Sequence, residues 1–436
     1  MNISVIGLGK LGLCTAACFA SKGHKVTGFD KNKYIMDELL SKRCPIDETD
    51  LENLLEKSWE NLTVTADIEN TVLNSEITLI IVPTPSLENG KFTNRYVEDV
   101  LNELGPVMKK KKEFHVIDVV STVMPGSCDK IFKPLLEKLS GRICGRDFGL
   151  VYNPEFIALG SVIRNFLNPD MVLIGASDDY SAGLVKKLYM ESCDSKPYIA
   201  TMSLVNGEIT KLSLNCFVTM KISFANELTS ICERVPDADV DVITDALGAD
   251  TRIGEKYLKG GLGFGGPCFP RDNIAFQAFA KEMNTEARLG TQVVNINNSV
   301  VDRLFNIISN NTDKKGKIAL LGLSYKPDTH IIEESQSIML ARKLVDADYI
   351  VQLHDPKALN SAEYELGEKV SYYNDPYLCV QNAGAVVLLT NWSIYGQLDW
   401  KRIGDLTENK PLLLDSWRVL KKVNKDKFRY IALGLG

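Results

Sequence analysis

In the first half of the chain, short apolar runs rich in β-branched residues alternate with longer stretches whose apolar residues recur at helical spacing. The first apolar run, residues 2–6, has the length of a strand, and a helical pattern over residues 11–22 follows it. Further strands are predicted at residues 25–29, 78–82, 114–119 and 149–152, and a further helix at residues 34–41. Such alternation is typical of a parallel sheet covered by helices on both faces.

A long helical pattern begins at Leu204 and continues to about Arg234, and Pro236 supplies a stop just beyond it. After this stretch the alternation returns, with strands predicted at residues 317–321, 350–354, 385–389, 412–414 and 430–433. The pattern therefore predicts an α/β protein with two doubly wound domains joined by a long central helix. We expect domains at residues 1–203, 204–300 and 301–436, the middle one helical.

At 436 residues the chain is too long for one ordinary hydrophobic core, which agrees with several domains. Hydrophobic residues make up 45% and charged residues 24%, as in soluble globular proteins. The net charge of −6 argues against nucleic acid as the main partner, because phosphate binding favours a basic face. The dense basic cluster at residues 109–112 is interpreted as a solvated helix end.

Ten cysteines without regular spacing and without a Cys-x-x-Cys pair predict neither a disulfide framework nor a structural zinc site. The four histidines are too scattered to indicate a metal cluster. The N-terminal residues lack the features of a signal peptide, and no apolar run approaches the ~20 residues of a membrane span. We therefore expect reduced thiols in a cytoplasmic protein with no membrane partner.

The first predicted strand is followed by Gly7-Leu8-Gly9-Lys10-Leu11-Gly12, which fits the pattern Gly-x-Gly-x-x-Gly and opens the first predicted helix. In this context the backbone amides at the helix N-terminus receive a pyrophosphate. The second strand ends at Asp30, 18 residues beyond Gly12, where a carboxylate accepts hydrogen bonds from a ribose and repels a 2′-phosphate. NAD is therefore predicted rather than NADP, bound by Gly7, Gly9, Leu11, Gly12 and Asp30.

Two later strand ends indicate the same cleft, because ligands of open α/β sheets bind beyond the carboxyl ends of the strands. Val82-Pro83-Thr84-Pro85 follows one buried strand, and Ser121-Thr122-Val123-Met124-Pro125-Gly126 follows the next along the chain. We predict that Thr84 and Thr122 contribute to cofactor binding.

Candidate chemistry lies in residues 263–272, which read Gly-Phe-Gly-Gly-Pro-Cys-Phe-Pro-Arg-Asp. Glycines let the backbone approach a ligand closely, so Cys268 in this turn is open to chemistry, whereas most cysteines fill core space. Asp272 follows four residues later. On the predicted central helix, Lys211 and Asn215 are four residues apart and share one face. Glu155 follows a predicted strand.

Together with NAD, these five residues form a coherent catalytic set. Oxidation of a primary alcohol gives an aldehyde, to which the Cys268 thiolate adds as a thiohemiacetal. A second oxidation gives a thioester, and water then releases a carboxylate. Lys211 and Asn215 are suited to stabilising the oxyanion of each tetrahedral stage. Asp272 and Glu155 are suited to removing protons and activating water.

These motifs resemble those of the UDP-glucose/GDP-mannose dehydrogenases, which make nucleotide-sugar uronic acids. The resemblance runs from Gly7 to at least Trp392, and its markers occur in the family order: GLGKLG, VPTP, STVMPG, YNPEF, Lys211-x-x-x-Asn215, DTRIG, GFGGPCFPRD and GLSYKPDT. It implies two Rossmann-like domains, a helical middle domain, NAD as cofactor and a nucleotide sugar as substrate. It also implies a homodimer formed through the central helix.

The resemblance implies roles for individual residues. Cys268 resembles the nucleophile, and Lys211 with Asn215 the oxyanion pair. Asp272 is similar to the carboxylate that works with Lys211 on a water, Glu155 to the residue implicated in thioester hydrolysis, and Thr122 to the threonine near the reacting centre. The residues implied to bind the substrate are Glu155, Phe156, Lys211, Asn215, Arg252, Lys259, Phe264, Gly265 and Lys326. Of these, Arg252 is implied to reach the site from the partner subunit.

Three positions depart from the family pattern. Leu159 stands where UDP-glucose enzymes commonly have a second glutamate, and Glu333 stands where much of the family has an arginine that helps to hold the cofactor. Trp417 falls in Asp415-Ser416-Trp417-Arg418, which replaces an Asp-x-Arg signature. Trp417 is expected to reshape the sugar pocket, and Arg418 has the length to reach back.

UDP-glucose is the default substrate, because Arg252-Ile253-Gly254 followed by GFGG resembles the UDP-glucose enzymes, and Pro-Glu-Phe differs from the Pro-Glu-Arg usual in N-acetylhexosamine enzymes. The three departures keep GDP-mannose and a UDP-N-acetylhexosamine as alternatives. Two other classes stay open. A two-electron NAD dehydrogenase would not need Cys268, and a non-catalytic dinucleotide-binding protein would fit the missing arginine at Glu333.

Overall fold

The computed structural model describes residues 1–157, 160–313, 315–421 and 425–436. The chain folds as two compact units, Met1–Ser213 and Leu214–Gly436. Helix α9 (Leu204–Cys232), which the hydrophobic pattern predicts, contains the residues on both sides of this division. Among the described residues, no helix combines the length and the apolar character needed to cross a membrane.

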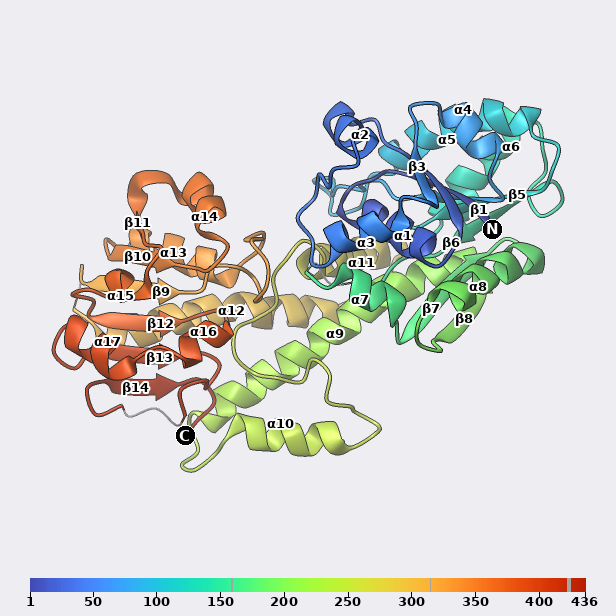
Figure 1. The fold of residues 1–436 in the computed structure, drawn as a ribbon. Coiled ribbons are helices and arrows are strands. Elements are labelled where there is room, and N and C mark those ends of the chain that lie inside the picture. The colour runs from blue at the N-terminus through green and yellow to red at the C-terminus, as the bar shows by residue number, and fades with distance from the viewer. Residues whose placement is uncertain (158–159, 314, 422–424) are drawn as a thin grey trace. The chain divides into compact units, whose positions relative to one another are not determined.

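The first unit is built on a sheet of eight strands in the order β3-β2-β1-β4-β5-β6-β7-β8 (Figure 1). The strands are β1 (Asn2–Ile6), β2 (Lys25–Phe29), β3 (Leu62–Val64), β4 (Ile77–Ile80), β5 (His115–Val119), β6 (Phe148–Tyr152), β7 (Met171–Ala176) and β8 (Tyr198–Ser203). The first six are parallel, as predicted. β7 pairs antiparallel with β6, so β7 and β8 run opposite to the others, which the sequence did not predict.

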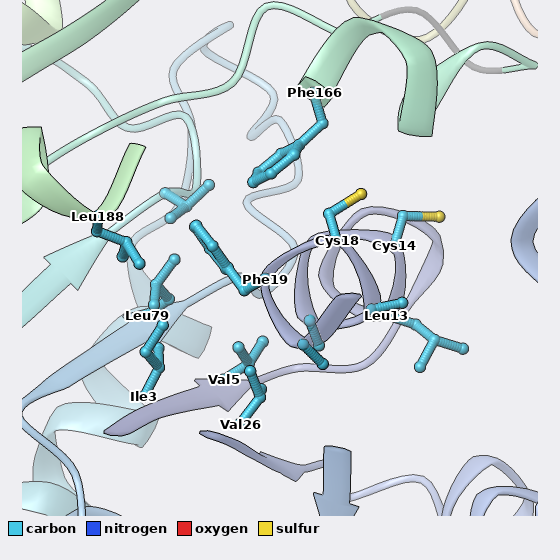
Figure 2. Packing of buried hydrophobic residues seen from close by; sticks show 14 of the residues in the cluster. Ile3, Val5, Leu13, Cys14, Cys18, Phe19, Val26, Leu79, Phe166 and Leu188 are labelled. Carbon is cyan, nitrogen blue, oxygen red and sulfur yellow. The ribbon is translucent and has the colours of Figure 1, made fainter. Parts of the chain in front are cut away.

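Helices cover both faces of this sheet. They are α1 (Lys10–Ser21), α2 (Lys33–Leu40), α3 (Leu51–Ser58), α4 (Ile68–Leu73), α5 (Arg95–Lys110), a π-helical turn (Cys128–Phe132), α6 (Lys133–Ser140), α7 (Val162–Leu167) and α8 (Asp179–Ser192). On one face, Phe19 of α1 packs edge-to-face on Phe166 of α7, with ring centroids 5.0 Å apart (Figure 2). The other face buries α5 and α6. The expected α/β layering is confirmed.

The sequence predicts a solvated helix end at residues 109–112, and for one of these lysines that prediction is wrong. Lys111 is 7% exposed. Its ammonium donates hydrogen bonds to the carbonyl oxygens of Val72, Leu73 and Ser75, at 2.9, 2.8 and 2.7 Å. These carbonyls lie at and just beyond the end of α4, where helix carbonyls lack partners within the helix. Lys111 therefore caps α4, and its burial follows from these three bonds.

The second unit contains a fully parallel sheet of six strands in the order β11-β10-β9-β12-β13-β14. The strands are β9 (Lys317–Leu321), β10 (Ile350–His354), β11 (Ser371–Tyr372), β12 (Ala385–Leu388), β13 (Leu412–Asp415) and β14 (Arg429–Ala432). The helices are α10 (Val240–Ala249), α11 (Phe269–Glu282), α12 (Arg288–Asn311), α13 (Gln336–Asp346), α14 (Leu359–Leu366), α15 (Pro376–Cys379), α16 (Ser393–Gly396) and α17 (Trp400–Leu406), with a 3₁₀ turn at Gly367–Lys369. The second doubly wound sheet is confirmed.

The turn after the first strand of the doubly wound sheet is built in the same way in both units. Gly7 follows β1 with φ +96°, and Gly322 follows β9 with φ +100°, in a region that favours glycine. Each glycine N–H donates at 2.8 Å to the carbonyl oxygen of the last residue of the neighbouring strand. The next amide along the chain donates to a carboxylate at the end of that strand, Asp30 at 2.6 Å or Asp355 at 2.7 Å.

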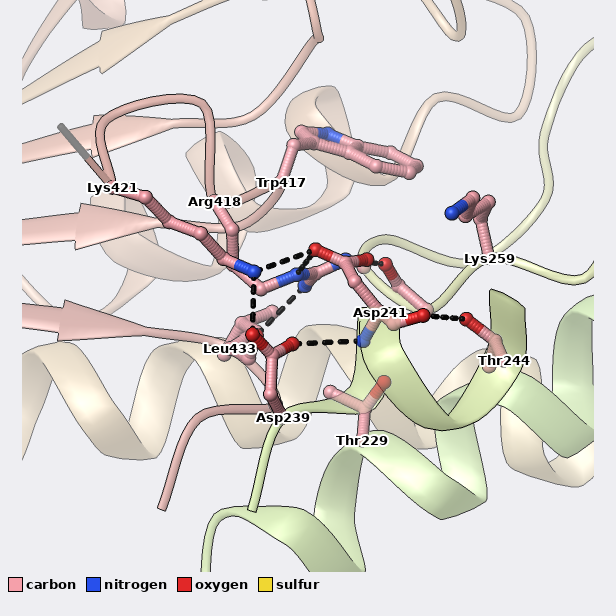
Figure 3. A network of polar contacts seen from close by, with 12 residues as sticks. Thr229, Asp239, Asp241, Thr244, Lys259, Trp417, Arg418, Lys421 and Leu433 are labelled. Carbon is pink, nitrogen blue, oxygen red and sulfur yellow. Dashed lines mark hydrogen bonds and ion pairs between the residues drawn. The ribbon is translucent and has the colours of Figure 1, made fainter. Parts of the chain in front are cut away.

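Arg418, beyond the end of β13, joins several elements of the second unit (Figure 3). Its side chain is 2% exposed and pairs with Asp241 of α10 through hydrogen bonds of 2.8 and 2.9 Å. It also donates to the carbonyl oxygens of Gly260 and Leu433, both at 2.7 Å. Burial alone would raise the pKa of Asp241, but the bonds and charges of Arg418 and Lys421 lower it to about 2.

Arg418→Ala is predicted to destabilise the protein, because it leaves two carbonyl oxygens without their Arg418 donor and the Asp241 carboxylate with Lys421 as its remaining cation. Removing one partner of a buried pair costs about 3–5 kcal/mol of unfolding free energy, and the partial exposure of Asp241 places the loss near the lower end. Urea unfolding followed by circular dichroism measures the change. Arg288→Ala is the control, since that side chain is 86% exposed and such an ion pair is worth about 0–1 kcal/mol. Equal stability of the two variants would contradict this role for Arg418.

Candidate active site

The glycine motif after β1 leaves the N-terminus of α1 accessible to a ligand. Gly12 packs so closely on the turn that a Cβ there would lie 1.8 Å from the Gly7 carbonyl oxygen. Gly9 is the N-cap of α1, and apart from its chain neighbours no described residue comes within 4 Å of the place its Cβ would take. Leu11 lies half-buried in the first turn, which contains no acidic residue. The N–H groups of this turn therefore suit a pyrophosphate.

Asp30 closes the same turn from the end of β2. Its Oδ2 accepts the Leu8 N–H at 2.6 Å, and its Oδ1 accepts the Asn32 N–H at 2.7 Å. A carboxylate has about four acceptor positions, so these bonds leave capacity for ribose hydroxyl groups. The Nζ of the neighbouring Lys31 lies 2.6 Å from a carboxylate oxygen of Glu103, which partly neutralises a cation that would otherwise suit a 2′-phosphate. These residues fit NAD.

Thr84 and Thr122 meet beyond the ends of β4 and β5. The buried Thr84 hydroxyl donates to the carbonyl oxygen of Thr122 at 2.6 Å. The loop after Thr122 is attached to α9 by Glu208, which is 0% exposed. The Glu208 carboxylate accepts the amide N–H of Gly126 at 2.5 Å and that of Cys128 at 2.8 Å. The backbone of this loop is thereby fixed to the first turns of α9.

The first unit also brings Glu155, Phe156 and Lys211 together. Lys211, in α9, is 7% exposed; its Nζ donates to the Glu155 carbonyl oxygen at 2.6 Å and lies 4.5 Å from the centroid of the Phe156 ring. The Glu155 carboxylate accepts a 2.9 Å hydrogen bond from the Tyr189 hydroxyl. Burial raises the pKa of Glu155 to about 7, although Tyr189 and Lys211 favour its ionised form. Glu155 therefore changes charge near neutral pH.

In the second unit, Cys268 is the N-cap of α11, and its side chain is exposed. Asp272, in the first turn of α11, is 1% exposed, and its amide donates to the Cys268 carbonyl oxygen at 2.8 Å. The Asp272 Oδ2 accepts a 2.6 Å hydrogen bond from the side-chain amide of Asn215, which is 7% exposed on α9. Cys268, Asp272 and Asn215 are thus brought together. Lys211 precedes Asn215 by four residues, on the same face of α9.

The glycine segment, residues 260–266, leads to Cys268 and is held by polar side chains of other elements. Asn226 of α9 makes two hydrogen bonds to its backbone, of 2.9 and 3.2 Å. Asn297 of α12 bonds both the N–H and the carbonyl oxygen of Phe264, at 2.7 and 3.0 Å. Gln336 of α13 accepts the amide that precedes Phe264 at 2.7 Å and donates to the Asn297 carbonyl oxygen at 2.8 Å.

Side chains larger than hydrogen do not fit at two points of the glycine segment. A Cβ on Gly265 would lie 2.3 Å from the Glu334 carbonyl oxygen. A Cβ on Gly266, whose φ is +80°, would lie 2.6 Å from the Tyr325 ring. Phe264 is 5% exposed. The path of the backbone toward Cys268 is therefore determined by its surroundings.

Besides Lys211, the resemblance assigns three cations to substrate contact, and each has a partner within the second unit. Arg252 is exposed and pairs with Asp250, with 2.6 Å between the charged atoms. Lys259 is exposed and pairs with Asp245. The half-buried Lys326 holds its Nζ 5.9 Å from the centroid of the Tyr325 ring. Their ligand contacts stay predictions.

Of the three departures from the family pattern, Leu159 lies outside the described residues. Glu333 is exposed, and its carbonyl oxygen accepts an amide of the glycine segment at 2.9 Å, so it supports that segment through its backbone. Trp417 is half-buried, and its indole N–H donates to the Leu389 carbonyl oxygen at 2.7 Å. Arg418 does reach back, but to Asp241 of α10 and to backbone carbonyls.

Sequence reasoning missed the side chains that hold these groups, namely Tyr189, Glu208, Asn226, Asn297 and Gln336. Asn297 shows the signal that was available: it lies between Val293 and Val300 on the buried stripe of α12. A polar residue at such a position is buried only with a hydrogen-bond partner. The sequence indicates that a partner exists, but the partner is a distant backbone segment that the sequence does not identify.

Models of one protein family match three successive segments of this chain. The model of the UDP-glucose/GDP-mannose dehydrogenase NAD binding domain matches residues 1–193. The model of the central domain of that family matches residues 205–299, and the model of its UDP binding domain matches residues 319–422.

Individual relatives agree with these matches. A UDP-glucose 6-dehydrogenase of Rickettsia bellii is 32% identical over 444 residues, which cover 100% of this chain and 99% of the relative. The structure of a UDP-glucose dehydrogenase from Pyrobaculum islandicum superposes with a TM-score of 0.90 at 30% identity, covering 100% of this chain and 98% of that one. A UDP-N-acetyl-mannosamine dehydrogenase from Staphylococcus aureus gives a TM-score of 0.79 at 25% identity, with 100% and 98% covered. The chain therefore belongs to the UDP-glucose/GDP-mannose dehydrogenase family of NAD-dependent oxidoreductases.

Proposed function

We propose that this protein oxidises the C6 hydroxymethyl group of a nucleotide sugar to a carboxylate in an NAD-dependent, four-electron reaction. UDP-glucose is the proposed substrate and UDP-glucuronate the product. The observation that carries the proposal is Cys268, an exposed side chain at the start of α11, presented by a glycine segment whose path is determined by its neighbours. Relatives named UDP-glucose 6-dehydrogenase support this substrate.

NAD supplies the oxidising power by accepting a hydride in each of two oxidations. Between them, the Cys268 sulfur bonds to the aldehyde carbon, and the carbonyl oxygen takes up a proton, which gives a thiohemiacetal. Oxidation of the thiohemiacetal leaves a thioester. Water then attacks the thioester carbon, the carbon–sulfur bond breaks, and the products are the carboxylate and the restored thiol.

The other catalytic residues of this proposal stabilise charge and move protons. Lys211 and Asn215 offer an ammonium and an amide N–H to the oxyanion of each tetrahedral stage. Asp272 and Glu155 serve as carboxylates for proton removal and water activation, and a pKa of about 7 lets Glu155 accept and release a proton near neutral pH. The N-terminus of α11 favours negative charge on the sulfur of Cys268. Thr122 lies near the reacting centre in this proposal.

The binding residues follow from the same argument. We propose that NAD is held by Gly7, Gly9, Leu11, Gly12, Asp30, Thr84 and Thr122. The nucleotide sugar is held by Glu155, Phe156, Lys211, Asn215, Lys259, Phe264, Gly265 and Lys326, with Arg252 contributed to the site of the partner subunit.

A second candidate substrate is a UDP-N-acetylhexosamine, with GDP-mannose as a third. The likeness to a UDP-N-acetyl-mannosamine dehydrogenase and the departures at Leu159, Glu333 and Trp417 favour keeping these in the test. Counting the NADH released per product, as described below, separates a two-electron dehydrogenase and a non-catalytic NAD-binding protein from the main proposal.

We also propose three functional parts, residues 1–203 for NAD, 204–300 for dimerisation and 301–436 for the nucleotide sugar.

A cytoplasmic location fits the nine cysteines other than Cys268, all of which are thiols rather than disulfides.

A homodimer through α9 is proposed from an exposed apolar stripe. Phe217, Phe224 and Ile231 follow one another at seven-residue spacing on this helix and are 60%, 48% and 57% exposed. Residues seven apart lie on one helix face. Val242 of α10 adds an apolar side chain that is 66% exposed. Exposed apolar patches of this kind mark protein–protein interfaces.

At neutral pH, iodoacetamide is predicted to label Cys268 at least about tenfold faster than any other cysteine, because the thiolate is the reactive form. Burial raises the pKa of Cys216 to about 12 and that of Cys193 to about 11, so these thiols are almost entirely protonated. Peptide mass spectrometry after timed labelling measures the rates. Cys268→Ser should remove the fast phase, and similar rates at several cysteines would contradict the proposal.

The protein is incubated with NAD and, in separate assays, with UDP-glucose, GDP-mannose or a UDP-N-acetylhexosamine. With UDP-glucose it is predicted to release two NADH for each carboxylate formed. Cys268→Ser should lower overall turnover by roughly a thousandfold or more, because it removes the nucleophile. NADH absorbance and mass spectrometry of the product measure both. If the protein turns over only another nucleotide sugar, that sugar is the substrate in place of UDP-glucose. One NADH per product, or full activity of Cys268→Ser, would refute the covalent route.

Phe224→Glu is predicted to convert the dimer to a monomer, because a carboxylate buried in an apolar interface pays a desolvation cost without a partner. Light scattering coupled to size-exclusion chromatography reports the mass. Tyr364→Glu is the matched control, since Tyr364 of α14 is 94% exposed and lies away from α9 in the sequence. The proposal fails if both variants keep the wild-type mass, or if the wild-type protein is a monomer.

A further inference from the structure

Trp417 lies two residues beyond the end of β13, at the carboxyl edge of the parallel sheet in the second unit. The strand order of this sheet reverses between β9 and β12, and ligands of such sheets bind outside the carboxyl ends of the strands at the reversal. Because β13 is the neighbour of β12, Trp417 lies on one side of the reversal between β9 and β12. Lys326, in the loop after β9, lies on the other side. The two loops are separated by two strand spacings, roughly 10 Å.

The loops around this place are tied together by hydrogen bonds. The Thr390 hydroxyl, beyond β12, donates to the Ser324 carbonyl oxygen, beyond β9, at 2.7 Å. The Trp417 indole N–H donates to the Leu389 carbonyl oxygen, which also follows β12, at 2.7 Å. This bond fixes the direction of the indole N–H.

The Trp417 ring packs against the glycine segment. Its six-membered ring lies so close to Gly261 that a Cβ there would be 2.7 Å from Cε3. Trp417 is nevertheless only half-buried, whereas Trp392, beyond β12, is 7% exposed and directs its N–H to Asp355. Arg418 directs its guanidinium to Asp241 and to backbone carbonyls (Figure 3).

We propose that the Trp417 indole is the stacking surface for the nucleobase of the nucleotide sugar, an inference that rests on the proposed function. Both Trp417 and Lys326 fall in residues 319–422, the segment matched by the UDP binding domain model. The indole N–H is already bonded to Leu389, so stacking is the contact left to this half-buried ring, and every base can stack on an aromatic face. Trp417 therefore contributes affinity for a nucleotide as a class.

Isothermal titration of UDP and of inorganic pyrophosphate into wild type, Trp417→Ala and Trp417→Phe tests the proposal without turnover. Trp417→Ala should weaken UDP binding about tenfold or more, as loss of base stacking does, and leave pyrophosphate binding unchanged. Trp417→Phe keeps a flat ring and should bind UDP within about threefold of wild type. UDP binding by Trp417→Ala within twofold of wild type would overturn the assignment, as would equal weakening of UDP and pyrophosphate.

Fluorescence keeps the proposal testable if Trp417→Ala does not fold. UDP should quench the tryptophan emission of the wild type and leave that of Trp417→Phe unchanged, since Trp392 and Trp400 are 7% and 3% exposed and Trp59 lies in the first unit. Equal quenching in both proteins would overturn the assignment. Binding of UDP through Trp417 without NADH release from any nucleotide sugar would refute the proposed oxidation alone.

Discussion

The glycine segment, residues 260–266, has few side chains with which to pack, so its conformation depends on hydrogen bonds from elsewhere. Asn226, Asn297, Gln336 and Arg418 supply them from α9, α12, α13 and the loop after β13. Each of these buried polar groups would lose about 1–3 kcal/mol if it were left without its partner. The position of Cys268 is therefore set by the core of the second unit, and the turn that carries it is ordered without a ligand.

Two half-buried carboxylates of this protein have pKa values shifted in opposite directions, according to what compensates their burial. Asp241 is bonded by an arginine and a lysine, and its pKa falls to about 2. Glu155 has a phenol and the more distant charge of Lys211, which do not outweigh burial, and its pKa rises to about 7. The first arrangement keeps a permanent charge that joins elements of the fold. The second gives a group that titrates in the range where general bases work.

Much of the fold follows from hydrophobic periodicity, because parallel strands buried on both faces and a long helix give strong signals. The strands around Gly7 and Gly322 and the extent of α9 were predicted in this way. The reversal of β7 was not, since a strand buried on both faces has the same pattern in either direction. At the candidate site, the sequence identifies the motif residues, but it does not identify the hydrogen-bond partners of Glu155 and of the glycine segment. Tyr189 and Asn297 act through contacts between residues far apart in the sequence, which one chain without its fold does not specify.

The repeated strand–turn geometry at Gly7 and Gly322 shows how one backbone shape can serve two purposes. Asp30 accepts two backbone N–H groups and remains half-buried, which leaves acceptor capacity on its oxygens. Asp355 is 3% exposed and accepts N–H groups from four backbone amides and from the Trp392 indole. Donors of the protein occupy the acceptor positions of its oxygens, so Asp355 links the loops that follow β9, β10 and β12. The two equivalent carboxylates, Asp30 and Asp355, thus differ in how many N–H groups of the protein they accept, and therefore in how much acceptor capacity they keep.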